Sequence, residues 1–154
     1  MQAGQFPYTG PLNPIDASAV VLTGPAGQYV MQVRDDKTGI FYPGHLGLFG
    51  GALRNGESFE QAAVRELEEE ISLNMEGRLT FLTRMTIGFE PMGAESVERV
   101  FYSAVLSADD IAEIQVDEGQ GYDLVAAEPL LLDRRVVPYD AFAIWLHCNA
   151  IGRT

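Results

Sequence analysis

One short stretch of the chain concentrates residue types that bind metal ions. Glu66, Glu69 and Glu70 are spaced three and four residues apart within segment 58–71, whose apolar residues recur with the period of a helix. At about 100° per residue, these carboxylates lie on one flank beside the apolar stripe, whereas Glu68 points to the opposite, solvated side. Like charges at this spacing repel one another, and a cation between them would relieve the repulsion. Oxygen-only ligands favour hard divalent ions, Mg²⁺ or Mn²⁺ before Zn²⁺.

The ordinary alternative is a solvated acidic helix face, and taken alone this is the more common meaning of a glutamate run. The surroundings of the run bear on the choice. Ser58 and Gln61 form a capping box that opens the helix. Arg65 falls close to Glu69 by the helical count. Alone, it would be read as half of a surface ion pair worth under about 1 kcal/mol.

The spacing from Gly51 to Leu73 resembles the Nudix box. That family pattern is Gly, five residues, Glu, seven residues, then Arg-Glu-aliphatic-any-Glu-Glu-any-Gly-aliphatic. Eight of its nine specified positions match here, and chance would produce such a match on the order of 10⁻⁵ times in a chain of this length. Ser72 replaces the family's glycine just beyond the helix. A left-handed residue there would cost serine roughly 1 kcal/mol; the alternative is a different cap, for example through Asn74.

The resemblance implies an activity and a set of residues for it. Nudix proteins hydrolyse the diphosphate linkage of a nucleoside diphosphate joined to another group, with the help of divalent cations. The metal ligands implied are the carbonyl of Gly50 and the carboxylates of Glu66, Glu69 and Glu70. The catalytic residues implied are Glu70 or a nearby carboxylate as base, Glu69, Arg65 as orienting arginine, and Glu57 as metal-positioning residue.

Residues outside the box would complete the site. Some Nudix enzymes recruit another acid from a later loop, and Glu118, which lies among glycines, is the candidate for a further metal ligand. A plain polar turn explains it equally well. Aromatic faces stack on nucleobases, and the candidates for binding substrate are Phe41, Tyr42, Phe89 and, less favoured, Tyr122. Taken singly, each of them is more often an ordinary core or surface aromatic. Phe142 and Trp145 sit at helical spacing and are expected in the core.

Composition limits the other classes of function. The 154 residues carry a formal net charge of −12, with 10 Lys+Arg against 22 Asp+Glu. Such a surface repels nucleic acid. The single cysteine excludes an intramolecular disulfide framework, and the sequence contains no signal peptide or bilayer-spanning apolar run. We expect a cytoplasmic protein with a small nucleotide-type substrate and no nucleic-acid or membrane partner, and we leave a homodimer open.

The chain is predicted to form one domain, 1–154, with an irregular N-terminal arm at 1–16. Strands are expected at 17–22 and 28–34 as a hairpin, and at 79–89 and 97–105; helices are expected at 58–71, 107–114 and 138–151. Segment 128–132 is expected to be a strand or a turn. Together with the resemblance, this order predicts an α/β fold, a Nudix-like α/β/α sandwich with a mixed β-sheet between helices.

Three hypotheses follow for the function. The leading one is a pyrophosphohydrolase dependent on Mg²⁺ or Mn²⁺ that acts on a nucleotide or nucleotide sugar. The alternative is a non-catalytic Nudix-like domain that senses a nucleotide. The complete Glu66/Glu69/Glu70 set argues against the alternative, because binding alone does not need so costly a cluster of charges. A third possibility, a homodimeric scaffold with a decayed site, would bind no metal.

Overall fold

The computed structural model describes residues 14–132 and 135–151, so most of the expected N-terminal arm lies outside the described residues. The strands are β1 (Ala17–Thr23), β2 (Tyr29–Val33), β3 (Leu46–Gly47), β4 (Phe49–Ala52), β5 (Thr80–Ile87), β6 (Val97–Val105) and β7 (Gly121–Val125). The helices are α1 (Phe59–Ile71), α2 (Ala108–Glu113), α3 (Ala127–Leu132) and α4 (Pro138–Ile151), with a 3-10 turn, η1 (Glu90–Met92).

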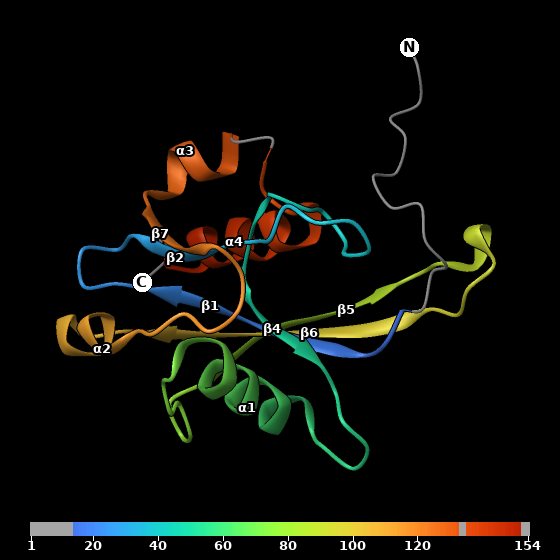
Figure 1. The fold of residues 1–154 in the computed structure, drawn as a ribbon, viewed down its shortest axis with the longest axis horizontal. Coiled ribbons are helices and arrows are strands. Elements are labelled where there is room, and N and C mark those ends of the chain that lie inside the picture. Colours follow the sequence, from blue (N-terminus) through green and yellow to red (C-terminus); the bar gives the residue numbers. More distant parts are fainter. Residues whose placement is uncertain (1–13, 133–134, 152–154) are drawn as a thin grey trace.

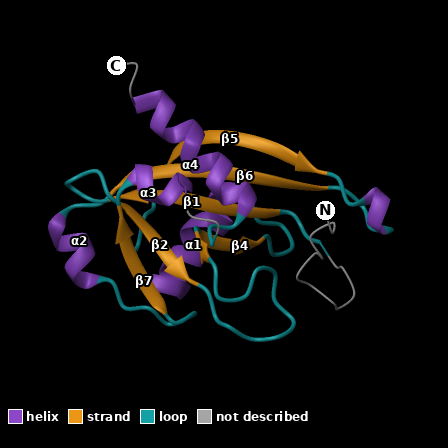
Figure 2. Cartoon of the chain, turned by 90° about the horizontal axis from the view of Figure 1, so that it is seen from above, coloured by secondary structure: helices purple, strands orange, loops and turns teal. Residues whose placement is uncertain are grey.

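The described strands form one seven-stranded mixed sheet. Its main order is β3-β2-β1-β6-β5, while β4 pairs with β1 and β7 pairs with β2. The β1–β6 pair is parallel, and the other strand pairs are antiparallel. Figure 1 shows α1 on one side of the sheet and α3 and α4 on the other, and Figure 2 shows α4 lying across the strands. The predicted α/β/α sandwich is confirmed.

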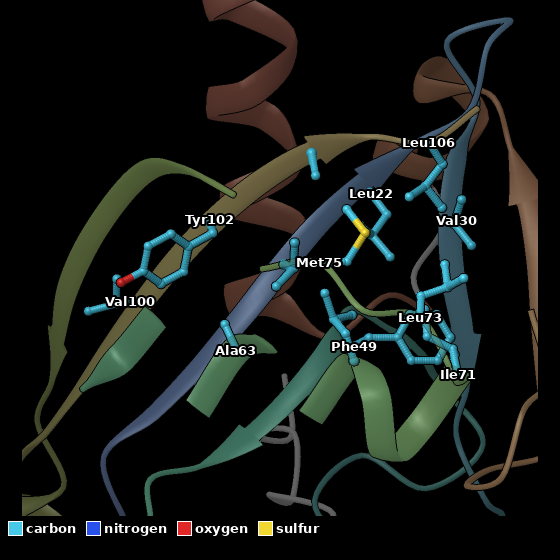
Figure 3. Packing of buried hydrophobic residues seen from close by; sticks show 13 residues of the cluster. Leu22, Val30, Phe49, Ala63, Ile71, Leu73, Met75, Val100, Tyr102 and Leu106 are labelled. Atoms are coloured by element: carbon cyan, nitrogen blue, oxygen red, sulfur yellow. The ribbon is translucent and has the colours of Figure 1, made fainter. Parts of the chain in front are cut away.

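Alternation along β1 separates two hydrophobic cores, as successive side chains of a strand must face opposite ways. Val20 and Leu22 belong to the cluster that includes the buried residues of α1, which Figure 3 shows around Phe49. Ala19 and Val21 belong to the cluster that includes residues of α4. Both faces of β1 are therefore buried, and this strand is the centre of the fold.

Helix α1 begins and ends as its sequence predicts. The Ser58 hydroxyl accepts from the N–H of Gln61 at 3.2 Å, and the Gln61 side chain accepts from the N–H of Ser58 at 2.9 Å. Leu67 and Ile71 are fully buried beneath the helix. Ser72 ends the helix in the left-handed conformation, with φ 59°, and its N–H donates to the carbonyl of Glu68 at 3.1 Å. Serine thus keeps the turn for which the family uses glycine.

The structure corrects three expectations. Segment 128–132 lies within helix α3 rather than in a strand or turn, and 121–125 forms strand β7, which the sequence analysis did not propose. Phe142 and Trp145 are 49% and 50% exposed and stack on each other at a centroid distance of 6.2 Å, so they are not core residues. Among the described helices, none has the length and apolar character to cross a membrane.

Candidate active site

Two glycines let strand β4 lie directly against the carboxylates of α1. Gly50 pairs with Ala19 of β1 and has φ 143°, and a Cβ there would collide with the carbonyl of Ser18. A Cβ on Gly51 would lie 2.6 Å from the carboxyl carbon of Glu66. At Gly50 only glycine fits, because a side chain would displace the backbone of β1, whereas at Gly51 a side chain would push the carboxylate of Glu66 out of its place.

Glu70 is the most buried of the box glutamates, with 4% of its surface exposed. Its Oε2 accepts from the N–H of Gly50 at 2.8 Å, and its Oε1 accepts from Nε2 of Gln32 at 3.3 Å. Burial raises the pKa of Glu70 to about 8, and the charges of Glu66 and Glu118 add to this effect, although the two hydrogen bonds oppose it. A buried carboxyl repelled by two other carboxylates is a place where a cation would be strongly stabilised.

These carboxylates line one cavity of about 230 Å³, here called the acidic cavity. Glu66, Glu70 and Glu118 contribute to its wall together with Gly50, so the structure brings together four of the five predicted metal ligands. The donor set consists of oxygens alone, and this fits Mg²⁺ or Mn²⁺. Glu118 reaches the cavity because its loop follows α2 and lies against β2, where its carbonyl oxygen is 3.5 Å from Nε2 of Gln32.

Glu69, the fifth predicted ligand, lies beside arginines instead. It has a 46% exposed side chain, and its carboxylate is 3.0 Å from Nη2 of Arg54 and 3.2 Å from Nη1 of Arg65. It is absent from the lining of the acidic cavity. Within residues 14–132 and 135–151, no three His, Cys, Asp or Glu side chains gather closely enough to hold a metal by themselves. A metal role for Glu69 stays a prediction.

Arg65 joins the loop before α1 to the helix. Its Nε donates to Glu57 at 2.6 Å, and its Nη1 donates to Glu66 at 2.5 Å as well as to Glu69. The bond from Arg65 and a bond from the N–H of Arg54 lower the pKa of Glu57 to about 2. Arg65 thus fixes the position of Glu66 at the cavity wall. Glu68 is exposed and points away, as the helical count predicts.

The predicted aromatic residues line a second cavity, of about 400 Å³, here called the aromatic pocket. Phe41 and Tyr42, from the loop between β2 and β3, meet there with Phe89, from the loop after β5, and with Tyr139 of α4. Ala52, at the end of β4, lines both the aromatic pocket and the acidic cavity. The two cavities are therefore neighbours. Tyr122, the less favoured candidate, packs against the hydrophobic core on the α1 side instead.

Sequence reasoning missed the cations of the site. Arg34 and Lys37, which follow β2, line the acidic cavity together with its glutamates and Asp35. Lys37 is 2.9 Å from Asp35, and Nε of Arg34 donates to the carbonyl of Phe41 at 3.0 Å. One feature of the sequence could have revealed them. Cations are rare in a chain with 10 basic and 22 acidic residues, and two of them stand close together near the end of a predicted strand. Arg99, in the aromatic pocket, was also missed.

Comparisons with known proteins agree with this geometry. The family model described as NUDIX domain matches residues 13–146. The MutT protein of Methanosarcina mazei Go1 is 17% identical, with 91% of this chain and 96% of that chain covered at a TM-score of 0.72. An Ap4A hydrolase of C. elegans, in a binary complex, is 19% identical, with 90% and 100% covered at 0.64. The NUDIX domain of Shewanella oneidensis NrtR, complexed with ADP ribose, is 16% identical, with 91% and 90% covered at 0.70.

No curated protein sequence matches the chain. At these low identities the solved structures establish the fold, while the family model establishes the relationship along most of the sequence. The box from Gly51 to Leu73 lies wholly inside the matched residues, and two of its carboxylates, Glu66 and Glu70, lie at the wall of the acidic cavity. On this evidence the chain belongs to the NUDIX family of hydrolases, which act on phosphoanhydride bonds.

Proposed function

We propose that this chain is a divalent-cation-dependent pyrophosphohydrolase that cleaves the diphosphate linkage of a nucleoside diphosphate joined to another moiety, as in a nucleotide or nucleotide sugar. The observation that carries the proposal is the contact of two unlike cavities at Ala52. The acidic cavity suits a metal-bound diphosphate, and the aromatic pocket suits a ring. A substrate with both parts fills both cavities.

Mg²⁺ or Mn²⁺ would be held by the Gly50 carbonyl and by carboxylates of Glu66, Glu69, Glu70 and Glu118. A divalent ion bound there supplies charge neutralisation for phosphate oxygens and acidifies a water. Glu70 is the best-placed base, because its pKa of about 8 lies close to neutral pH and its carboxylate is held by Gly50 and Gln32. Arg65 acts through the carboxylates that it binds, by holding Glu57 and Glu66 in position.

The two cations of the acidic cavity, Arg34 and Lys37, would interact with the phosphates of the substrate. Arg34 and Lys37 face an incoming diphosphate, and they would offset part of the repulsion that the neighbouring carboxylates exert on it. Phe41, Tyr42 and Phe89 would stack on the ring of the substrate in the aromatic pocket. Two similar structures support a nucleotide substrate, the Ap4A hydrolase and the NUDIX domain complexed with ADP ribose.

The second candidate is a non-catalytic domain that senses a nucleotide. The burial of Glu70 weighs against it. A buried carboxyl with a raised pKa lowers the stability of the fold at neutral pH, and such carboxyls are typical of catalytic sites. A cytoplasmic location and a homodimer remain predictions from the sequence.

Turnover on a panel of nucleoside diphosphate derivatives, with Mg²⁺ or Mn²⁺ and with EDTA, separates the two candidates. The enzyme hypothesis expects release of a nucleoside monophosphate and a second phosphorylated product only when metal is present. Tight binding of a panel member without turnover in either metal would favour the sensor and contradict the proposed activity.

A further inference from the structure

Arg99 is a cation in the otherwise aromatic and apolar wall of the aromatic pocket. It lies on β6 next to Ala17 of β1, and 17% of its side chain is exposed. Its guanidinium carbon lies 4.6 Å from the ring centre of Tyr139 and 5.4 Å from that of Phe101. Two rings therefore hold the guanidinium group in place within the pocket.

The guanidinium has hydrogen-bonding capacity that the described residues leave unused. Nη2 donates to Oδ1 of Asp140 at 3.3 Å, whereas the buried Nε has no hydrogen-bond partner in the part of the chain that the structure describes. A guanidinium carries five N–H donors, and a buried donor without a partner is costly. The buried Nε lies out of a ligand's reach, so a ligand in the aromatic pocket would place its acceptors against the remaining N–H groups of Nη1 and Nη2.

The surroundings of Arg99 indicate which kind of acceptor fits. Asp140 is buried and also accepts from the N–H of Leu48 at 3.0 Å, so its carboxylate stays beside Arg99 and offsets the positive charge. Because Asp140 offsets its charge, the guanidinium of Arg99 attracts a phosphate only weakly, but its N–H groups can still donate hydrogen bonds in fixed directions. The pocket wall includes Ile87, Val97 and Phe89, which favour a neutral, flat ring.

We propose that Arg99 is the residue that selects the base of the substrate, and that it selects a purine with two adjacent acceptors, as the N7 and O6 edge of guanine has. The inference rests on the proposed function, since it assigns the aromatic pocket to the base. A guanidinium matches that edge with two parallel hydrogen bonds, whereas adenine presents an amino group beside N7 and would oppose donor to donor. Such a pair discriminates by about tenfold or more.

The test measures binding of nucleoside monophosphates by calorimetry with Mg²⁺ present. Monophosphates contain no phosphoanhydride bond, so the measurement does not depend on turnover. GMP and IMP, which share the N7 and O6 edge, should bind about tenfold or more tighter than AMP. 7-Deaza-GMP, which lacks the N7 acceptor, should lose most of that advantage in the wild-type protein, so that a ligand change tests the edge without any variant.

Arg99→Lys keeps the charge beside Asp140 but replaces the planar pair of donors with an ammonium. It should bring the affinity for GMP to within threefold of that for AMP, while Glu68→Gln on the exposed face of α1 should leave the preference unchanged. Any one of four results would overturn the inference. These are equal binding of GMP and AMP, no binding of either, full affinity for 7-deaza-GMP, and a folded Arg99→Lys protein that keeps the preference. If turnover depends on metal but shows no base preference, only the role of Arg99 is refuted. If the base preference is present but no member of the diphosphate panel is turned over, only the proposed function is refuted.

Discussion

The backbone N–H of Gly50 donates to Oε2 of Glu70 across 2.8 Å, and this bond ties strand β4 to the last turn of α1. The φ of Gly50, 143°, turns its N–H toward the helix, and the carbonyl of Ser18 fills the place of a side chain. Gln32 holds the other carboxylate oxygen. Both oxygens of Glu70 are therefore oriented by β2 and β4, before any ligand binds.

Replacement of this carboxylate tests its role in catalysis. We expect Glu70→Gln to lower kcat by about 100-fold or more, because the amide can neither accept a proton nor supply a charged ligand. The protein should stay folded, since the amide keeps the shape of the side chain and cannot acquire the charge that burial, Glu66 and Glu118 disfavour. Steady-state rates at saturating Mg²⁺ measure the effect.

Glu68→Gln is the matched control on the same helix. Its side chain is exposed, and the rate should stay within about threefold, a barrier change under about 1 kcal/mol. A near-normal rate in a folded Glu70→Gln protein would remove Glu70 from the catalytic set.

The raised pKa of Glu70 predicts a specific dependence of stability on pH in the metal-free protein. Between the ordinary value of 4.5 and about 8, the folded protein keeps a proton that the unfolded chain has released. The free energy of unfolding should therefore fall as pH rises through this window. Burial raises the pKa of Asp140 as well, so the contribution of Glu70 has to be separated from other sources.

The difference between wild type and Glu70→Gln isolates one of these sources. Urea unfolding in EDTA at about pH 5 and about pH 8.5 should show a larger loss of stability for wild type than for the variant. Parallel pH profiles for the two proteins would mean that the environment of Glu70 does not favour its protonated form.

The parts of the fold that the sequence predicts well are those coded locally. Helix α1 has its capping box, its apolar period and its stop within 15 residues, 58–72, and the structure matches each of them. Gly51 belongs to the same local pattern, since it begins the box and sits against Glu66. Local hydrogen bonds and sterics fix these features without reference to distant strands.

The parts that escaped prediction depend on distant residues. Strand β7 is stabilised by pairing with β2, about 90 residues earlier, and the sequence of 121–125 does not indicate this pairing. Pro129 lies in the first turn of α3, where a helix tolerates proline, so it did not exclude the helix. Helix α4 is apolar on all sides, so its sequence does not reveal that Phe142 and Trp145 face solvent. The meeting of the two cavities at Ala52 is likewise a product of topology.

The left-handed cap of α1 offers a prediction about stability. Ser72 has φ 59°, a conformation that costs a residue with a Cβ about 1–2 kcal/mol and glycine almost nothing. Ser72→Gly should raise the free energy of unfolding by about 0.5–1 kcal/mol, after allowance for the greater freedom of glycine in the unfolded chain. Chemical denaturation measures the change.

Ser72→Ala is the control for the side chain. It removes the exposed hydrogen bond from the Ser72 hydroxyl to Asp117, 3.3 Å in length, but keeps the left-handed cost. It should bring no gain in stability. If Ser72→Gly were no more stable than Ser72→Ala, the backbone conformation would not be the limiting feature of this turn.

The last prediction concerns metal binding. Millimolar Mg²⁺ or Mn²⁺ should stabilise the folded protein, because a cation in the acidic cavity relieves repulsion among Glu66, Glu70 and Glu118 that the unfolded chain does not have. At ten times Kd the gain is about 1.4 kcal/mol, or some 2–4 °C in Tm. Glu70→Gln should shrink the shift. Glu69→Gln should shrink it too if Glu69 leaves Arg54 and Arg65 to join the metal.

General screening by salt is the competing explanation for a chain with net charge −12. NaCl at equal ionic strength tests it, since screening acts on all exposed charges alike and weakens little at a buried site. A shift with NaCl as large as that with Mg²⁺, or a full shift in Glu70→Gln, would show that the acidic cavity is not the metal site. A full shift in Glu69→Gln alone would keep the acidic cavity as the site and leave Glu69 as a partner of the arginines.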